Sequence, residues 1–113
     1  MTASDKFVRP TESDWTPTEP GVKRRILTYN DQLMVVEVAF EEGAVGALHR
    51  HPHIQASYVA DGAFEVTISG RTEVLTKGQS FIVPGDEWHG CRALEAGVLV
   101  DTFTPMRAEF LAN

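Results

Sequence analysis

Residues 61–70 read DGAFEVTISG, an alternating stretch with a glycine turn at each end. Alternation of apolar and polar residues is typical of a β-strand with one buried face, which here would carry Phe64, Val66 and Ile68. Residues 34–40, MVVEVAF, repeat this pattern in another part of the chain. The two stretches indicate half-buried strands and therefore a β-rich domain.

Further turn signals separate short segments along most of the chain. They are Glu42-Gly43, Asp61-Gly62, Ser69-Gly70, Lys77-Gly78, Pro84-Gly85-Asp86 and Ala96-Gly97. Asp-Gly favours a two-residue hairpin turn because glycine adopts positive φ without steric cost, so Asp61-Gly62 predicts a hairpin. Many short strands with regular turns predict an all-β sandwich or barrel. The one helical candidate is a short turn in the tail, residues 105–112.

Length and composition favour a single domain that follows an extended arm. A chain of 113 residues is long enough to bury one core. Residues 1–20 carry three prolines among Thr, Ser, Asp and Glu, a composition that resists packing and predicts an extended N-terminal arm. We expect residues 21–113 to form one β-barrel domain.

Charge and cysteine content exclude several classes of protein. The formal net charge of -6 argues against a nucleic-acid partner, because such proteins concentrate Lys and Arg on one face. A single cysteine cannot form an internal disulfide, and the N-terminus lacks the apolar stretch of a signal peptide, so we expect a cytoplasmic protein. The apolar runs are too short to span a membrane.

Three of the four histidines lie within residues 49–53. In a strand, side chains two residues apart share a face, so His49 and His51 are predicted to direct both imidazoles at one point. Gln55 has the same parity and offers a carbonyl oxygen, and His89 from a distant strand would complete a metal site. The alternative is a solvated surface pair. Because Pro52 interrupts a regular strand, we interpret His53 as a loop histidine or as one that lies behind the metal ligands without binding the metal.

The spacing of these residues resembles the two sequence signatures of the cupin superfamily. The first signature is matched by Gly43, His49, His51, Gln55 and Gly62, and the second by Gly78, Pro84 and His89. The chain departs from the pattern at Gln55, where glutamate is usual, at Asp86, where glycine is usual, and at Ala93, where asparagine is usual. The resemblance implies an antiparallel jelly-roll barrel, also described as a double-stranded β-helix.

Glutamine in place of glutamate changes the charge of the predicted metal site. Three neutral imidazoles and an amide leave a divalent cation with its full charge, so the site should bind metal less tightly and polarise an oxygen ligand more strongly. It should also attract an anion. Imidazole-rich sites suit Zn, Ni, Fe, Mn or Cu, and the sequence does not select among these divalent transition metals.

A second candidate site lies near the C-terminus, in residues 97–107, GVLVDTFTPMR. If Leu99 faces inward, Asp101 does too, and desolvation would then raise the pKa of a carboxyl suited to act as a general base. In the opposite register Val98 faces inward and Asp101 is solvated, and periodicity alone does not separate the two. Arg107 offers a bidentate fork to a substrate carboxylate.

A closer resemblance, over residues 21–111, is to the small cupins called pectin-degradation proteins, which ketonise 4,5-unsaturated uronates. The shared features are Gly-Val-Lys-Arg at 21–24, Gly-Ala-Val-Gly-Ala-Leu-His at 43–49, His51-Pro52-His53 with Gln55, and Asp101-x-Phe103-x-Pro105-x-Arg107. The resemblance implies metal ligands at His49, His51, Gln55 and His89, and activity from Asp101, Phe103 and Arg107. It also implies an inward Asp101, a small anionic sugar as substrate, and a homodimer.

Two other functions compete with a uronate-ketonising enzyme. One is an iron-dependent dioxygenase, since that class also uses histidine-rich cupin sites. The other is a non-catalytic, metal-containing module that binds a small ligand. Cys91 lies two residues after His89, and we interpret it as a buried, unreactive thiol rather than a ligand.

Overall fold

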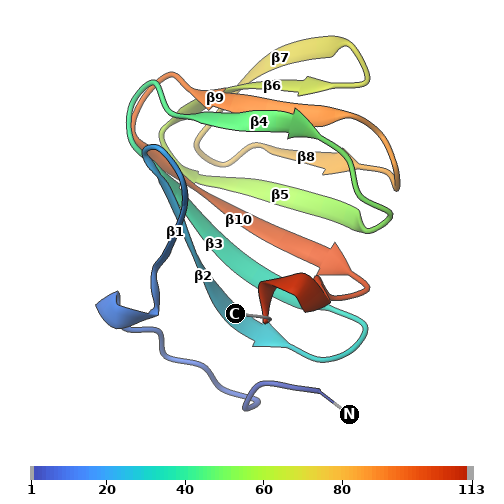
Figure 1. Ribbon diagram of the computed structural model, residues 1–113. Helices are drawn as coiled ribbons and strands as arrows, with labels where there is room; N and C mark the ends of the chain where they lie inside the picture. The colour runs from blue at the N-terminus through green and yellow to red at the C-terminus, as the bar shows by residue number, and fades with distance from the viewer. Residues whose placement is uncertain (1, 112–113) are drawn as a thin grey trace.

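The computed structural model describes residues 2–111, in which ten strands form two facing antiparallel sheets and two single 3-10 turns lie outside the sheets (Figure 1). The strands are β1 (Thr16–Glu19), β2 (Val22–Tyr29), β3 (Met34–Phe40), β4 (Val45–His49), β5 (Ile54–Asp61), β6 (Ala63–Ile68), β7 (Arg71–Thr76), β8 (Ser80–Val83), β9 (His89–Ala93) and β10 (Gly97–Thr104). The turns are η1 (Glu12–Asp14) and η2 (Ala108–Phe110).

The six-stranded sheet has the order β1-β2-β3-β10-β5-β8, and the four-stranded sheet has the order β4-β9-β6-β7. The chain crosses repeatedly between them, so β4 and β5, which follow each other in sequence, belong to opposite sheets. This topology confirms the predicted all-β jelly-roll barrel. The strand alternation predicted for residues 34–40 and 63–68 is also confirmed, because both are strands with a buried face.

Two hydrophobic clusters fill the space between the sheets. The larger contains Val22, Phe40, Val59, Phe64, Val66, Ala93 and Leu99. Phe40 and Phe64 meet edge to face, with ring centroids 5.1 Å apart, an arrangement that aromatic pairs prefer. The smaller cluster contains Met34, Val36 and Phe103. The candidate site residues therefore stand on strands fixed by buried apolar packing.

The N-terminal segment contains more regular structure than an extended arm. Strand β1 pairs with β2 and adds an edge to the larger sheet. Trp15 lies under two cations of β2, with Lys23 Nζ 4.7 Å and Arg25 Cζ 4.3 Å from its ring centroid. Residues 15–19 thus contact the barrel, while the division of the chain at residue 20 stays a prediction.

The predicted hairpin at Asp61-Gly62 is wrong. Gly62 instead joins β5 to β6, which lie in different sheets, and it does so with φ +80°. A Cβ at Gly62 would lie 2.6 Å from the carbonyl oxygen of Ala96, so close chain approach as well as the positive φ requires glycine here. A two-residue hairpin of this kind lies at Ser69-Gly70, where both residues have positive φ between β6 and β7.

The tail forms only the short turn η2, with no regular α-helix in residues 105–111; residue 112, the end of the predicted helical stretch, lies outside the described residues. The described part of the chain contains no helix of the length and hydropathy required to cross a bilayer.

Candidate metal centre

Neighbouring strands of the smaller sheet bring two of the candidate histidines together. In the β4–β9 pair, His49 and His89 are direct cross-strand partners, and their ring centroids lie 4.3 Å apart. The parity argument for His51 is wrong, because β4 ends at His49 and His51 follows in the connection to β5. The His51 ring nevertheless lies 4.8 Å from that of His89 and 5.5 Å from that of His49.

A backbone carbonyl fixes the orientation of each of the three imidazoles. The Nδ1 atoms of His49, His51 and His89 lie 2.8, 3.1 and 2.9 Å from the carbonyl oxygens of residues 47, 53 and 87. A carbonyl oxygen only accepts, so each Nδ1 must donate. In the neutral ring the Nε2 atom then carries a free lone pair, which is the tautomer that a metal ligand needs.

The three imidazoles converge on one point. One potential ligand atom from each lies within 4.8 Å of the others. His89 Nε2 is buried and has no hydrogen-bond partner among residues 2–111. Burial lowers the pKa of His89 to about 4 and, together with the charge of Arg107, lowers the pKa of His51, so both rings are held neutral. A divalent transition ion fits this donor set.

Gln55 approaches the cluster from the opposite sheet. Its Oε1 atom lies 3.1 Å from His51 Nε2. Because His51 donates through Nδ1, both facing atoms present lone pairs, and a cation beside them would satisfy both. This geometry is compatible with a fourth, oxygen ligand, so the assignment of Gln55 as a ligand stays a prediction that the surroundings favour.

The register of β10 places Asp101 inside the barrel. Leu99, Asp101 and Phe103 are all buried, which resolves the choice between the two registers that the sequence left open. Asp101 is the cross-strand partner of Ser57, whose Oγ donates to Asp101 Oδ1 at 2.6 Å. Burial raises the pKa of Asp101 to about 6, and the hydrogen bond from Ser57 and the charge of Arg107 oppose the rise.

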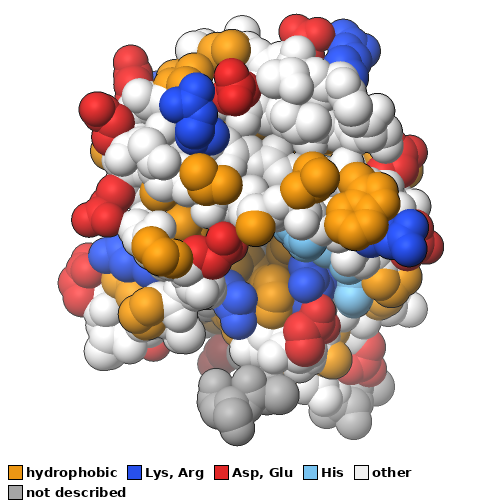
Figure 2. Space-filling view, turned by 45° about the horizontal axis from the view of Figure 1, so that its top comes forward, with side chains coloured by type: hydrophobic (Ala, Val, Ile, Leu, Met, Phe, Trp, Pro, Cys, Tyr) orange, Lys and Arg blue, Asp and Glu red, His pale blue; other side chains and the backbone are white. Residues whose placement is uncertain are grey.

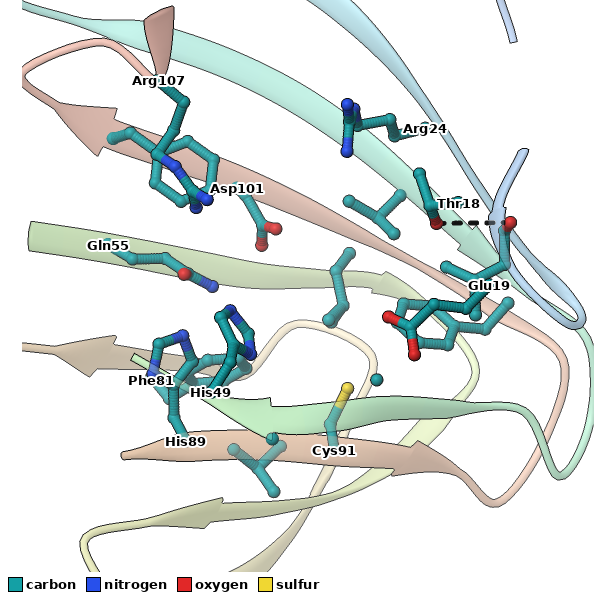
Figure 3. Close-up of a pocket in the computed structure, with 18 of the residues that line it drawn as sticks. Thr18, Glu19, Arg24, His49, Gln55, Phe81, His89, Cys91, Asp101 and Arg107 are labelled. Carbon is teal, nitrogen blue, oxygen red and sulfur yellow. Dashed lines mark hydrogen bonds between the residues drawn. The ribbon is translucent and has the colours of Figure 1, made fainter. Parts of the chain in front are cut away.

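Arg107 follows β10 and lies against two aromatic rings. Its Cζ atom is 5.2 Å from the centroid of Phe103 and 4.5 Å from that of Phe110. Its Nε donates to Glu109 at 2.6 Å, and only 12% of its side chain is exposed. These contacts hold the guanidinium in one place, where it faces the same pocket as Asp101 (Figure 3).

Apart from His51, the candidate residues line a cavity of about 200 Å³ that opens as a hollow on one face (Figures 2 and 3). The polar residues that line it are Thr18, Glu19, Arg24, His49, Gln55, His89, Asp101 and Arg107. Figure 3 shows His49 and His89 on one wall, with Gln55, Asp101 and Arg107 facing them. The structure thus brings a candidate metal centre, a buried carboxyl and a guanidinium to one cavity.

Sequence reasoning missed three residues of this region. Arg24 is a second guanidinium at the cavity, with its Cζ 3.8 Å from the Phe110 centroid. Glu19 reaches the cavity from β1 and accepts from the backbone N–H of residue 47 at 3.3 Å. Ser57 is buried beside Asp101. The signal that could have found Ser57 was its strand parity with Gln55, and Arg24 lies in the segment 21–24 that the resemblance covered.

Two residues outside the predicted ligand set also lie near the site. His53 lies beside His51, with ring centroids 5.4 Å apart, and its backbone oxygen accepts from His51 Nδ1. Cys91 lines the cavity, and burial together with the charge of Asp101 raises the pKa of its thiol to about 12. A thiol with that pKa is protonated at neutral pH and is a poor nucleophile, in agreement with the unreactive interpretation.

Residues 36–103 match the Cupin domain family. The chain belongs to the cupin family. This cupin is 46% identical over 102 residues to the pectin degradation protein KdgF of Dickeya dadantii (strain 3937), and the match covers 88% of this chain and 93% of that protein.

Solved cupin structures have the same architecture. The fold matches an RmlC-like cupin from Shewanella frigidimarina NCIMB 400 with a TM-score of 0.92 and 40% identity, over 97% of this chain and 99% of that one. It matches KdgF from Halomonas sp. with a TM-score of 0.89 and 39% identity, over 95% and 99% of the two chains. The predicted resemblance to the pectin-degradation cupins is therefore confirmed.

Proposed function

We propose that this cupin is a metal-dependent enzyme that opens and ketonises 4,5-unsaturated uronates from the breakdown of pectin or alginate. The observation that carries the proposal is the shared cavity, in which His49 and His89 face a buried carboxyl and an arginine, while His51 converges on the same point as these two histidines. A relative with 46% identity bears the name pectin degradation protein, which supports the same substrate class.

The charges around the cavity suit a small anionic sugar. The chain as a whole has a net charge of -6, yet Arg24 and Arg107 both line the cavity and stack on Phe110. Burial and the charge of Arg107 both lower the pKa of Arg24, as expected for two nearby cations in a partly enclosed place. Local field decides the attraction of a ligand more than net charge does, so a carboxylate is favoured here.

Ring opening removes the proton of the anomeric hydroxyl and breaks the bond between the anomeric carbon and the ring oxygen, which gives an aldehyde and, once the ring oxygen takes up a proton, an enol. Ketonisation then removes the enol O–H proton and places a proton on the former alkene carbon. Asp101 is the group assigned to move these protons, because its raised pKa, about 6, suits a carboxyl that both accepts and returns a proton near neutral pH. Arg107 holds the substrate carboxylate through its guanidinium. Phe103, which is buried, forms the apolar wall beside it.

His49, His51, His89 and Gln55 would hold the divalent ion, which when bound supplies a Lewis acid that stabilises negative charge on substrate oxygens. The native ion is expected among Zn, Ni, Fe and Mn. A homodimer, which the family resemblance implies, and a cytoplasmic location, which the N-terminus and the cysteine content predict, both stay predictions.

The direct test is an ultraviolet or NMR assay of purified protein with 4,5-unsaturated galacturonate, with and without a chelator. We expect rapid loss of the alkene signal, with the rate falling to the buffer rate after chelation. Asp101→Asn should abolish most of the activity, and Asp61→Asn, an exposed aspartate at the end of β5, is the matched control. No acceleration over buffer by metal-loaded protein would contradict the proposal and favour the dioxygenase or ligand-binding alternatives.

A further inference from the structure

Ser57 lies between Gln55 and Asp101 and is hydrogen-bonded to both. Gln55 Nε2 donates to Ser57 Oγ at 2.9 Å, and Ser57 Oγ donates to Asp101 Oδ1 at 2.6 Å. Ser57 is 2% exposed, so bulk water does not compete for either hydrogen bond. The register of β5 against β10 produces this pair of hydrogen bonds, because Ser57 is the cross-strand partner of Asp101 and has the same strand parity as Gln55.

The hydroxyl of Ser57 has one proton and two lone pairs. An ionised carboxylate only accepts, so the proton of Ser57 is used on Asp101. Toward residue 55, Ser57 can then offer only a lone pair. The group that faces it there must be an N–H donor, which a carboxamide supplies and a carboxylate does not.

The same count of donors fixes which end of the Gln55 amide faces the imidazoles. With Nε2 held by Ser57, the Oε1 atom is turned toward His51, 3.1 Å from its Nε2. A flipped amide would put Oε1 against the lone pair of Ser57, and two buried acceptors would face each other there, which is unfavourable. In the observed orientation the facing acceptors are Oε1 and His51 Nε2, and a bound cation would satisfy both of them.

We infer that Ser57 is a positioning residue that aims Gln55 Oε1 at the imidazole cluster, and that Asp101, acting through Ser57, selects glutamine over glutamate at position 55. The inference depends on the proposed function for the role of Gln55 as a ligand. It accounts for the departure of this chain from the usual cupin signature at that position.

The first test replaces Ser57 by alanine and measures Zn²⁺ affinity by chelator competition, together with NMR of the side-chain amides in metal-free protein. We expect the Kd for Zn²⁺ to rise by about 10- to 100-fold, as for other groups that orient metal ligands. The Gln55 side-chain amide protons should shift and exchange faster with solvent. Ser80→Ala, at an exposed serine of the neighbouring strand β8, should change neither quantity.

Ser57→Thr keeps a hydroxyl and should restore both the affinity and the amide signals. A Gln55 amide spectrum in Ser57→Ala that equals that of the wild type would overturn the inference, whatever the affinity. An affinity within about threefold of the wild type would overturn it as well, since such a change lies below the effect expected for an orienting group.

A second test begins with four proteins that all retain Ser57. Gln55→Glu is introduced into the wild type and into Asp101→Asn, and Zn²⁺ affinity is measured in all four proteins. In the Asp101→Asn background, the introduced amide can donate to Ser57, whose own proton is then free for a glutamate at position 55. We expect Gln55→Glu to be more favourable for Zn²⁺ binding in this background than in the wild type by about 10-fold. Equal effects in the two backgrounds would refute the selection of glutamine by Asp101.

Direct repulsion between the carboxylate of Asp101 and the carboxylate introduced by Gln55→Glu would couple the two substitutions with the same sign. The four-protein cycle is therefore repeated in a Ser57→Ala background. The coupling between positions 55 and 101 should be smaller there if the Ser57 hydroxyl transmits it. An unchanged coupling would contradict the role of Ser57. All of these measurements use Zn²⁺ and amide signals alone. A failure of uronate turnover would therefore leave them standing, and the inference and the proposed function fail separately.

Discussion

Asp101→Asn is expected to remove activity and, at the same time, to stabilise the metal-free fold at neutral pH. The carboxyl of Asp101 is buried, and its pKa rises from 3.8 to about 6 in the folded protein. Each pKa unit corresponds to about 1.36 kcal/mol, so keeping this group ionised costs the folded state about 3 kcal/mol. Asparagine has a similar shape and carries no charge that must be buried.

The sign of the pH dependence follows from the two pKa values. Between pH 3.8 and about 6 the folded state binds the proton more tightly than the unfolded state, so the stability of the wild type falls as pH rises through this window. Below it the carboxyl is neutral in both states and the variant has no such advantage. Above it the free energy of unfolding of Asp101→Asn should exceed that of the wild type by about 3 kcal/mol.

Urea unfolding of both proteins in the presence of chelator, from about pH 4 to about pH 7.5, measures this difference. Asp61→Asn, which alters an exposed carboxylate, should show a small difference that does not grow with pH. If the advantage of Asp101→Asn is constant over the range, Asp101 does not carry a buried charge and the reasoning is refuted. In the uronate assay the same variant should lose about 10²- to 10⁴-fold in rate, the usual contribution of a general acid or base.

Three other changes test separate parts of the structure. Adding Zn²⁺ at about 100 times its Kd should raise the free energy of unfolding of the wild type by about 2.7 kcal/mol, and His89→Ala should lose most of this gain in a thermal or urea titration. Cys91, which is half-buried and whose thiol pKa is raised to about 12, should react slowly with iodoacetamide until the protein unfolds, and fast labelling of the folded protein would contradict the raised pKa. Gly62→Ala should destabilise the fold by more than about 1 kcal/mol, because an added Cβ would lie 2.6 Å from the Ala96 oxygen at a φ of +80°; equal unfolding midpoints would show that the corner can relax.

The strands follow from sequence where one face is cleanly buried. Phe64, Val66 and the residues between them alternate because the side-chain period of a strand is a local property, and β6 has that burial pattern. The error at Gly62 has a different origin. An Asp-Gly pair indicates that the chain turns with positive φ. It does not indicate whether the next strand belongs to the same sheet.

The contacts within the candidate site could not be predicted from local sequence patterns alone. His49 and His51 were expected together from strand parity, yet β4 ends at His49, and it was the motif spacing that identified the pair. Ser57 and Asp101 lie 44 residues apart in sequence, and only the register of β5 against β10 makes them partners. Register depends on the packing of both sheets, so strand parity can place Ser57 on the same face as Gln55 but cannot identify Asp101 as its partner.

The main-chain carbonyls that hold the three imidazoles have a consequence for how the protein tolerates mutation. Residues 47, 53 and 87 each contribute a carbonyl oxygen, an atom that every amino acid possesses. Point substitutions at these positions can change the side chain and still leave the acceptor in place. Substitutions at these positions therefore do not change which nitrogen of each histidine carries the proton. Side chains that line the cavity can then change to suit new substrates while the three imidazoles keep the tautomer that binds a metal.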